Sequence, residues 1–137
     1  MTTGRGERTV RVLLVTTGVV TATPALALLD PYALEWTYGV TNPDAMTLAL
    51  LQHRGMLQFV LGAALVWAAW FRPARPAAAL GAVATKTVFL ALILPNAAIR
   101  GDLALFSVIF DLFCVVVLTA IAVRQLYPQF AARALPA

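Results

Sequence analysis

The chain has 137 residues, of which 61% are hydrophobic and only 12% are charged. Typical soluble domains are about half apolar and about a quarter charged, so 10 basic and 6 acidic residues are too few to keep a domain of this length in water. This composition excludes a free cytosolic enzyme, a disordered chain and a nucleic-acid-binding module, and it predicts a membrane protein of one domain, residues 1–137. The single cysteine, Cys114, and the single histidine, His53, exclude disulfide scaffolds, iron–sulfur clusters and multi-histidine metal centres, so we expect no metal and no cofactor.

Four apolar stretches are each long enough to cross a bilayer, which takes about 20 helical residues. They cover residues 9–29, 47–71, 78–95 and 103–123, and proline-containing turns such as Asp30-Pro31 and Arg72-Pro73 stand at their ends. We therefore predict an all-α fold, an antiparallel four-helix transmembrane bundle.

The first apolar stretch has a second interpretation, as a cleaved secretory signal. Arginines precede it, and the small-residue sequence Ala25-Leu26-Ala27 is typical of a cleavage site. The apolar run from Val12 to Leu29 is longer than the usual signal core of about 7–15 residues, which favours a membrane span. Cleavage would leave three spans, and the charge pattern is compatible with both forms.

The arginines are distributed unequally between the two sides of the expected bundle. One side, made of the N-terminal segment, the loop between the second and third stretches and the C-terminal tail, carries seven of them: Arg5, Arg8, Arg11, Arg72, Arg75, Arg124 and Arg133. The other side carries one arginine and four acids: Arg100, Asp30, Glu35, Asp44 and Asp102. Because loops rich in Lys and Arg stay in the cytoplasm, we expect both termini to be cytoplasmic. The membrane is then the inner (plasma) membrane, and the preference for arginine over lysine is typical of a bacterium with a GC-rich genome.

Several polar residues fall inside the apolar stretches. In the second stretch Arg54 and Gln58 are four residues apart and share a helix face, and His53 precedes them, about 10 Å below the outer surface at 1.5 Å per residue. Lys86 in the third stretch and Asp111 in the fourth fall near the middle of the bilayer, as Gln58 does. Placing a charge there costs about 2.5–3.5 kcal/mol of free energy, and an ion pair between Lys86 and Asp111 is the least costly way to reduce this penalty. In a low dielectric the pair can also share a proton with both groups neutral.

A group of short features lies in the middle of the chain, between Leu48 and Ala91: His53-Arg54-Gly55, Gly62 and the Arg72-Pro73 boundary. In these features the segment resembles small four-span bacterial membrane families, the BphX-like and DoxX-like groups. The resemblance implies a four-helix bundle and assigns no catalytic residue. The chain is also similar in its general kind, although no motif is shared, to the small membrane-bound terpene cyclases. Those enzymes are acid-initiated catalysts built inside helical bundles.

Our first hypothesis is a cofactor-free membrane enzyme that cyclises or isomerises a lipophilic, isoprenoid-type substrate by acid-initiated proton transfer. Asp111, kept neutral by an apolar site, would be the general acid, and Lys86 or His53 would take the proton back. The expected substrate-binding residues lie toward the outer mouth of the bundle: Arg54, Gln58 and Trp36. Trp36 would belong to a lid formed by residues 30–46.

The second hypothesis is a non-catalytic membrane subunit, in a homo-oligomer or as a scaffold of a larger complex. In it Lys86 and Asp111 only lock two helices together, Arg54 extends toward the outer surface, and Trp36 is an interfacial anchor. A cavity open to lipid among Gln58, Lys86 and Asp111 would favour the enzyme, and tight packing there would favour the subunit. In both cases the expected partners are the membrane and a lipid or lipophilic small molecule, with no nucleic acid.

Overall fold

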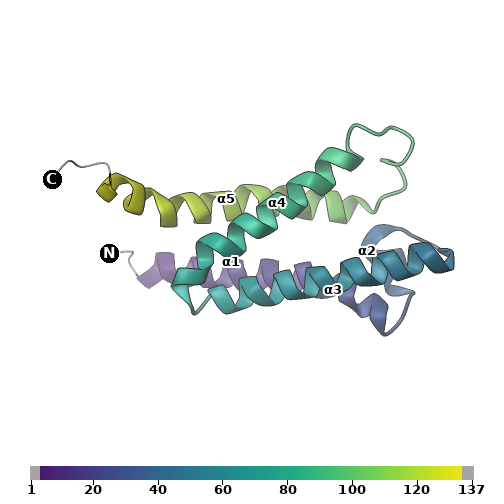
Figure 1. Cartoon of the computed structure of the whole chain (residues 1–137), viewed down its shortest axis with the longest axis horizontal. Coiled ribbons are helices and arrows are strands. Elements are labelled where there is room, and N and C mark those ends of the chain that lie inside the picture. Colours follow the sequence, from purple (N-terminus) through teal and green to yellow (C-terminus); the bar gives the residue numbers. More distant parts are fainter. Residues whose placement is uncertain (1–3, 134–137) are drawn as a thin grey trace.

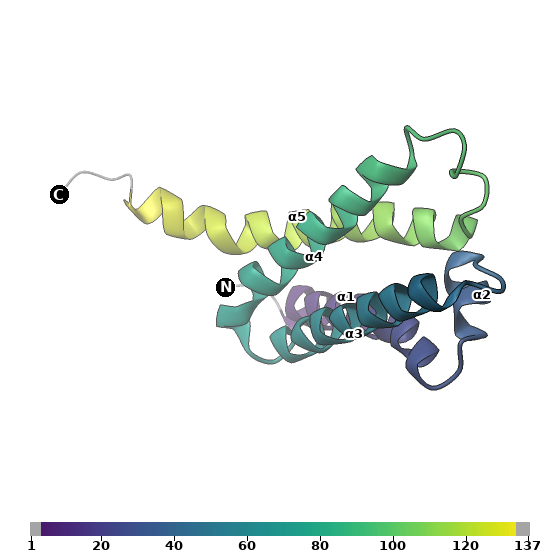
Figure 2. The same cartoon turned by 45° about the vertical axis from the view of Figure 1, so that its right-hand side comes forward.

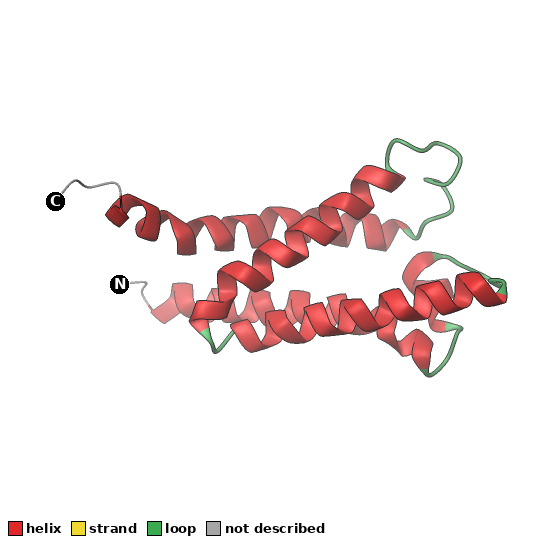
Figure 3. Ribbon diagram, viewed as in Figure 1, coloured by secondary structure: helices red, strands yellow, loops and turns green. Residues whose placement is uncertain are grey.

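The chain folds into helices and short connections in the computed structural model, which describes the backbone of residues 4–133 and the side chains of residues 4–128. The long helices are α1 (Gly4–Ala22), α3 (Ala45–Ala68), α4 (Arg75–Ile93) and α5 (Leu105–Arg133). Three short elements join them: the 3₁₀ helices η1 (Thr23–Leu28) and η2 (Arg72–Ala74), and the helix α2 (Ala33–Tyr38). Within the described residues there is no strand (Figure 3).

Four segments are long and apolar enough to cross a membrane: Gly4–Leu28, Ala45–Ala68, Arg72–Ile93 and Leu105–Pro128. This confirms the prediction of an all-α chain with four apolar spans. The helix ends differ from those of the predicted stretches by several residues, most of all where α1 begins at Gly4 and α5 continues to Arg133. The extension of α1 is polar, and that of α5 mixes polar residues with apolar ones and includes Pro128, so a search for long apolar stretches does not detect them.

The four long helices are arranged as two pairs. α1 packs along α3 and α4 packs along α5, whereas α3 and α4 diverge from the turn at η2 (Figures 1 and 2). The beginning of α1 and the end of α5 lie at the same end of the molecule as η2 (Figure 1), which we call the η2 end. The opposite end contains α2 and the loop between α4 and α5, and we call it the α2 end.

Two glycines bring α1 and α3 into close contact. A Cβ atom on Gly18 would lie 2.7 Å from the carbonyl oxygen of Gly62, and a Cβ atom on Gly62 would overlap the carbonyl oxygen of Gly18. Any larger residue at either position would therefore push the backbones apart. Small residues at such crossings let membrane helices gain van der Waals contact where no hydrophobic effect drives them together.

The apolar core has two parts. The larger part lies toward the η2 end, and each long helix contributes fully buried side chains to it: Leu14, Leu65, Ala79 and Leu118. The smaller part lies at the α2 end and joins η1 to α2: Ala27, Ala33, Leu34 and Tyr38. The second cluster fixes α2 against the ends of the long helices, and thereby places α2 beside the polar site.

Hydrogen bonds fix α2 and the start of α3 at the α2 end. Ser107 Oγ donates to the carbonyl oxygen of Thr37, and the backbone N–H of Ala104 donates to that of Tyr38 at 3.3 Å. Asp44 caps α3 by accepting from the backbone N–H groups of Met46 and Thr47 at 2.9 and 3.0 Å. These contacts hold Tyr38 next to the beginning of α5.

Candidate functional site

A buried ion pair joins α4 to α5. Lys86 Nζ donates a hydrogen bond to Asp111 Oδ1 at 2.5 Å, and the two residues are only 3% and 6% exposed. The ammonium group also lies 4.8 Å from the ring centroid of Phe110, whose negative face stabilises a cation. The structure thus pairs the two charged residues that the sequence analysis expects at the same depth.

The ion pair lies in the wall of a small polar chamber of about 50 Å³. Residues of α1, η1, α2, α3, α4 and α5 line it. Five of the six predicted site residues are among them: Trp36, Arg54, Gln58, Lys86 and Asp111. Because one water takes up about 30 Å³ in the liquid, the chamber has room for one or two waters or for the end of a ligand, but not for a whole lipophilic molecule.

Three buried polar atoms of residues that line the chamber form no hydrogen bond of good geometry among the described residues: Thr21 Oγ1, Tyr38 OH and Gln58 Oε1. The side chains of Gln58 and Arg54 nevertheless lie near enough to the Tyr38 hydroxyl to interact with it. Burial raises the pKa of the Tyr38 hydroxyl, so this group stays protonated and can donate, while the Gln58 oxygen can only accept. A buried polar atom left unsatisfied costs about 1–3 kcal/mol. The chamber is therefore suited to a guest that both accepts and donates, such as water or a hydroxyl group.

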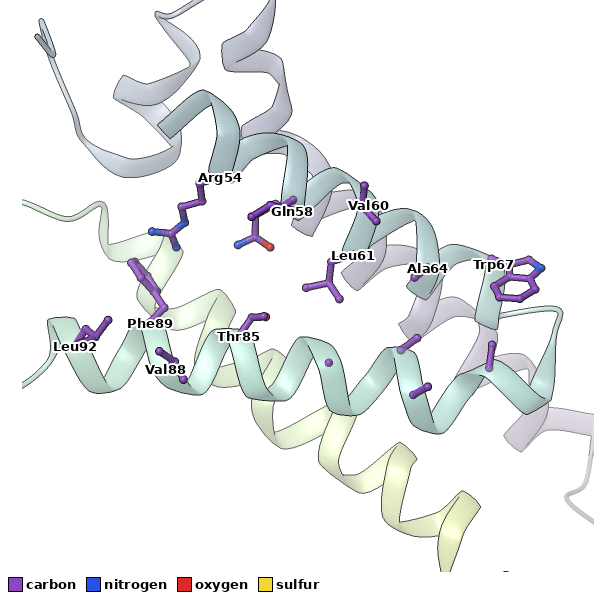
Figure 4. Close-up of a pocket in the computed structure, with 15 residues that line it drawn as sticks. Arg54, Gln58, Val60, Leu61, Ala64, Trp67, Thr85, Val88, Phe89 and Leu92 are labelled. Carbon is purple, nitrogen blue, oxygen red and sulfur yellow. The ribbon is translucent and has the colours of Figure 1, made fainter. Parts of the chain in front are cut away.

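A larger apolar cleft of about 750 Å³ lies between α3 and α4 (Figure 4). Its walls are the helix faces that diverge from η2, and they include Leu57, Val60, Leu61, Ala64 and Trp67 on α3 and Gly81, Thr85, Val88, Phe89 and Leu92 on α4. Arg54 and Gln58 line both this cleft and the polar chamber. In Figure 4 both side chains project from α3 toward α4. The two cavities therefore adjoin at the α2 end of the cleft.

Arg54 has aromatic neighbours but no acidic one. Its guanidinium carbon lies 4.2 Å from the ring centroid of Phe89 and 4.8 Å from that of Tyr38. In the described part of the chain, the acidic partners of all ion pairs are Glu7 and Asp111, and neither is paired with Arg54. Arginines within membrane segments normally pair with an acid or a carbonyl group. Arg54 also interacts with the Tyr38 hydroxyl, but a guanidinium has five N–H donors, so donors remain for a polar or anionic group from outside the chain.

Two predicted site residues lie at or beyond the edge of this arrangement. Trp36 lines the chamber from α2 but is half exposed. His53 is exposed on α3 and lines neither cavity, since neighbouring helix residues point about 100° apart. The structure therefore brings Lys86 and Asp111 together with Arg54 and leaves His53 apart from them.

The sequence reasoning missed one polar cluster, which lies at the η2 end. Arg75 is 0% exposed, and its guanidinium donates to both carboxylate oxygens of Glu7, at 2.7 and 3.2 Å. The same guanidinium donates to the carbonyl oxygens of Ala68 and Ala69 at 2.9 and 2.8 Å. Two further arginines lie 3.1 Å from the Glu7 carboxylate: Arg11 and Arg72. The signal in the sequence is Glu7 itself, the one acid among the arginines of this side.

Within residues 4–133, no group of three or more His, Cys, Asp and Glu side chains is placed so that it could hold a metal ion. Comparison of the chain with protein-family models, with curated protein sequences and with solved structures found no match. The resemblance to the BphX-like and DoxX-like groups therefore stays a prediction. What the fold shows is a chain with four apolar helices, compatible with a multi-pass membrane protein.

Proposed function

We propose that this chain is a multi-pass protein of a bacterial inner membrane, an antiparallel four-helix bundle with both termini in the cytoplasm, that binds a lipophilic molecule between α3 and α4. The four apolar helices support the membrane setting, and the excess of arginines on the side with the termini supports the orientation. One observation supports the binding of a ligand. Arg54, which has no acidic partner among the described residues, lies where the apolar cleft meets the polar chamber.

The apolar part of the ligand would lie along the cleft, with its polar end at Arg54 and Gln58. A volume of about 750 Å³ lies within the range of about 300–1,000 Å³ that is typical of small-molecule sites. Leu57 and Val88 in the cleft walls are more than half exposed, so a ligand could enter directly from the lipid. A polar end group that accepts hydrogen bonds from the Arg54 guanidinium would offset part of the cost of placing this charge in the membrane.

We further propose that the ligand is an isoprenoid-type substrate, isomerised or cyclised by proton transfer without a cofactor. The scheme requires the form of the pair in which Asp111 carries the proton and Lys86 is an amine. Asp111 would give this proton to a carbon–carbon double bond, whose π electrons form the new C–H bond and leave a carbocation. Lys86 would then take a proton from the neighbouring carbon, which creates a shifted double bond. The proton returns to Asp111 through the hydrogen bond between the two side chains.

Only the end of the substrate would react in this scheme, because the chamber is small. The reacting double bond would be the one next to the polar end group. With that group held by Arg54 and Gln58, which line both cavities, the double bond would enter the chamber beside the ion pair. Aromatic rings of Trp36, Tyr38 and Phe110 line the chamber, and their faces stabilise a positive charge. His53 has no part in the scheme, since it lies outside both cavities.

A second candidate is a non-catalytic membrane subunit, in a homo-oligomer or a larger complex. The observation that favours it is the tightness of the ion pair: Lys86 and Asp111 are each more than nine-tenths buried and joined by a 2.5 Å hydrogen bond. Such a pair also fulfils a purely structural role, because it locks α4 to α5. In this case the molecule in the cleft would be a bound lipid that is not converted.

Binding is tested by tryptophan fluorescence in detergent with a fatty acid that carries bromine in its chain. Trp67 lines the cleft, so the bromine should quench its emission, and Trp67→Phe should remove this part of the quenching. Arg54→Gln should weaken binding about tenfold or more, since a hydrogen bond to a charged group contributes about 1.5–3 kcal/mol. His53→Gln, one residue away but outside the cleft, is the matched control. Equal binding by both variants would contradict the assignment of Arg54.

Catalysis is tested with Asp111→Asn, in membranes supplied with isoprenoid substrates. The amide has the shape of the carboxyl group and still forms hydrogen bonds, but it cannot deliver a proton. We expect product formation to stop while the quenching of Trp67 is kept. Product formed at the wild-type rate would remove Asp111 from the mechanism. Wild-type protein that binds the lipid and forms no product would favour the non-catalytic subunit.

A further inference from the structure

A second groove, of about 690 Å³, lies between α1 and α5 at the η2 end. Its apolar walls are Val10 and Leu13 on α1 and Val117 and Ile121 on α5. Along α5 the lining extends from Val116 to Pro128, which corresponds to about 18 Å at 1.5 Å per residue. No residue of this groove lines the cleft between α3 and α4, so the two sites are separate.

The rim of the groove is strongly basic. Arg72 and Arg124 line it and are exposed, and Arg124 forms no ion pair within the described part of the chain. The one carboxylate in the lining, Glu7, is already paired with three arginines, Arg11, Arg72 and Arg75. Three positive charges and one negative charge leave this cluster with a net charge of +2, before Arg124 is added. The rim is therefore complementary to an anion in spite of the carboxylate.

We propose that this groove binds one anionic phospholipid, with its phosphate at Arg72 and Arg124 and an acyl chain along the apolar walls. Along the helices the lining of the groove changes from charged to apolar. A phospholipid changes in the same order, from its charged headgroup to its acyl chains. A soluble anion would gain nothing from Val10, Leu13 and Val117, and an uncharged hydrocarbon would gain nothing from the arginines. Basic residues at the ends of membrane helices attract anionic headgroups, each contributing about 1 kcal/mol.

The test measures lipid retention by native mass spectrometry of the whole protein, with phosphatidylglycerol and phosphatidylcholine of the same acyl chains added to the detergent. We expect one phosphatidylglycerol per chain to be retained in preference to phosphatidylcholine. Arg124→Gln should weaken this retention about fivefold. Arg8→Gln is the matched control, since Arg8 is exposed on the same side of the chain, loses the same charge and does not line the groove.

A second variant tests the apolar part without changing the charge. Val117→Phe fills the groove from α5, and it should reduce phosphatidylglycerol retention as Arg124→Gln does. The thermal unfolding temperature of both variants is recorded to show that they are folded. Equal losses in Arg8→Gln and Arg124→Gln would show diffuse attraction to a basic surface and would overturn the proposal. Equal retention of the two lipids, or a protein dimer in place of the bound lipid, would overturn it as well.

Discussion

Arg75 of α4 forms a two-point ion pair with Glu7 of α1, 68 residues earlier in the chain. The same guanidinium binds the carbonyl groups of Ala68 and Ala69 at the end of α3. One fully buried side chain therefore connects three of the four spans. A guanidinium stays charged at any physiological pH, so it can be buried here only because the carboxylate and the two carbonyl groups replace its hydration.

Replacing Glu7 should destabilise the protein through Arg75. Glu7→Gln would leave a buried guanidinium without its counter-charge, and we expect the free energy of unfolding in detergent to fall by about 2–3 kcal/mol, because the two carbonyl hydrogen bonds remain. Thermal unfolding followed by circular dichroism measures this. Glu35→Gln is the control, since Glu35 is an exposed acid that forms no ion pair among the described residues. Equal effects of the two changes would show that the ion pair contributes nothing.

The ion pair between α4 and α5 predicts strong coupling between its two members. Lys86→Met and Asp111→Leu should each cost about 3–5 kcal/mol, because each leaves one charge buried without a partner. The double change removes both charges and leaves apolar side chains, so part of the loss should be recovered. A double-mutant cycle from unfolding curves in detergent gives the coupling energy. Strictly additive losses would mean that the two groups do not interact.

The close crossing of α1 and α3 predicts that one added methyl group is harmful. Gly62→Ala would place a Cβ atom against the carbonyl oxygen of Gly18, and overpacking of this kind costs about 1–3 kcal/mol. Gly81→Ala is the control within another span, because its Cβ atom would meet only Leu61 Cδ1, at 3.7 Å. We expect a lower unfolding temperature for Gly62→Ala alone. A lower temperature for both variants would point to a general intolerance of larger residues.

The proposed orientation predicts the positions of two reporters. A reporter enzyme fused after Arg133 should be active as a cytoplasmic fusion, and one inserted near Thr41 should report an exterior position. The reason is the excess of arginines on the side of the termini. Fusions to paired cytoplasmic and periplasmic reporters check each position independently. A cytoplasmic signal from the insertion near Thr41 would end the four-span topology as proposed.

Much of the fold follows from the sequence, because a membrane imposes a simple rule on helix length and polarity. Helical spacing also predicted that Arg54 and Gln58 share a face, and in the structure both project into the same cleft. Depth counting placed Lys86 and Asp111 at the same level, which is the condition for the pair that they form. The helix face that a residue occupies and its depth along the helix both follow from residue spacing, so the sequence predicts them.

The remaining features depend on how the helices pack against each other. The cleft exists because α3 and α4 diverge from η2, and no local pattern specifies that angle (Figure 1). The contact of Glu7 with Arg75 joins residues that are 68 positions apart in the chain, and no local pattern predicts it. His53 shows that neighbours in the sequence need not belong to the same site. It directly precedes Arg54, but it lies on another face of α3 and does not line the cleft.

If the chain spans a membrane as proposed, the location of the Lys86–Asp111 pair within one pair of helices has a consequence for its insertion. α4 and α5 are consecutive, and the two charges are 25 residues apart on the two arms of one hairpin. If these arms leave the insertion machinery together, each charge is already neutralised by the other before either helix meets α1 or α3. A nascent chain halted before Asp111 would instead expose a lone ammonium group to lipid. In the proposed topology, the hairpin of α4 and α5 is thus the smallest unit containing either of these two charges that can enter the bilayer without leaving one of them unpaired.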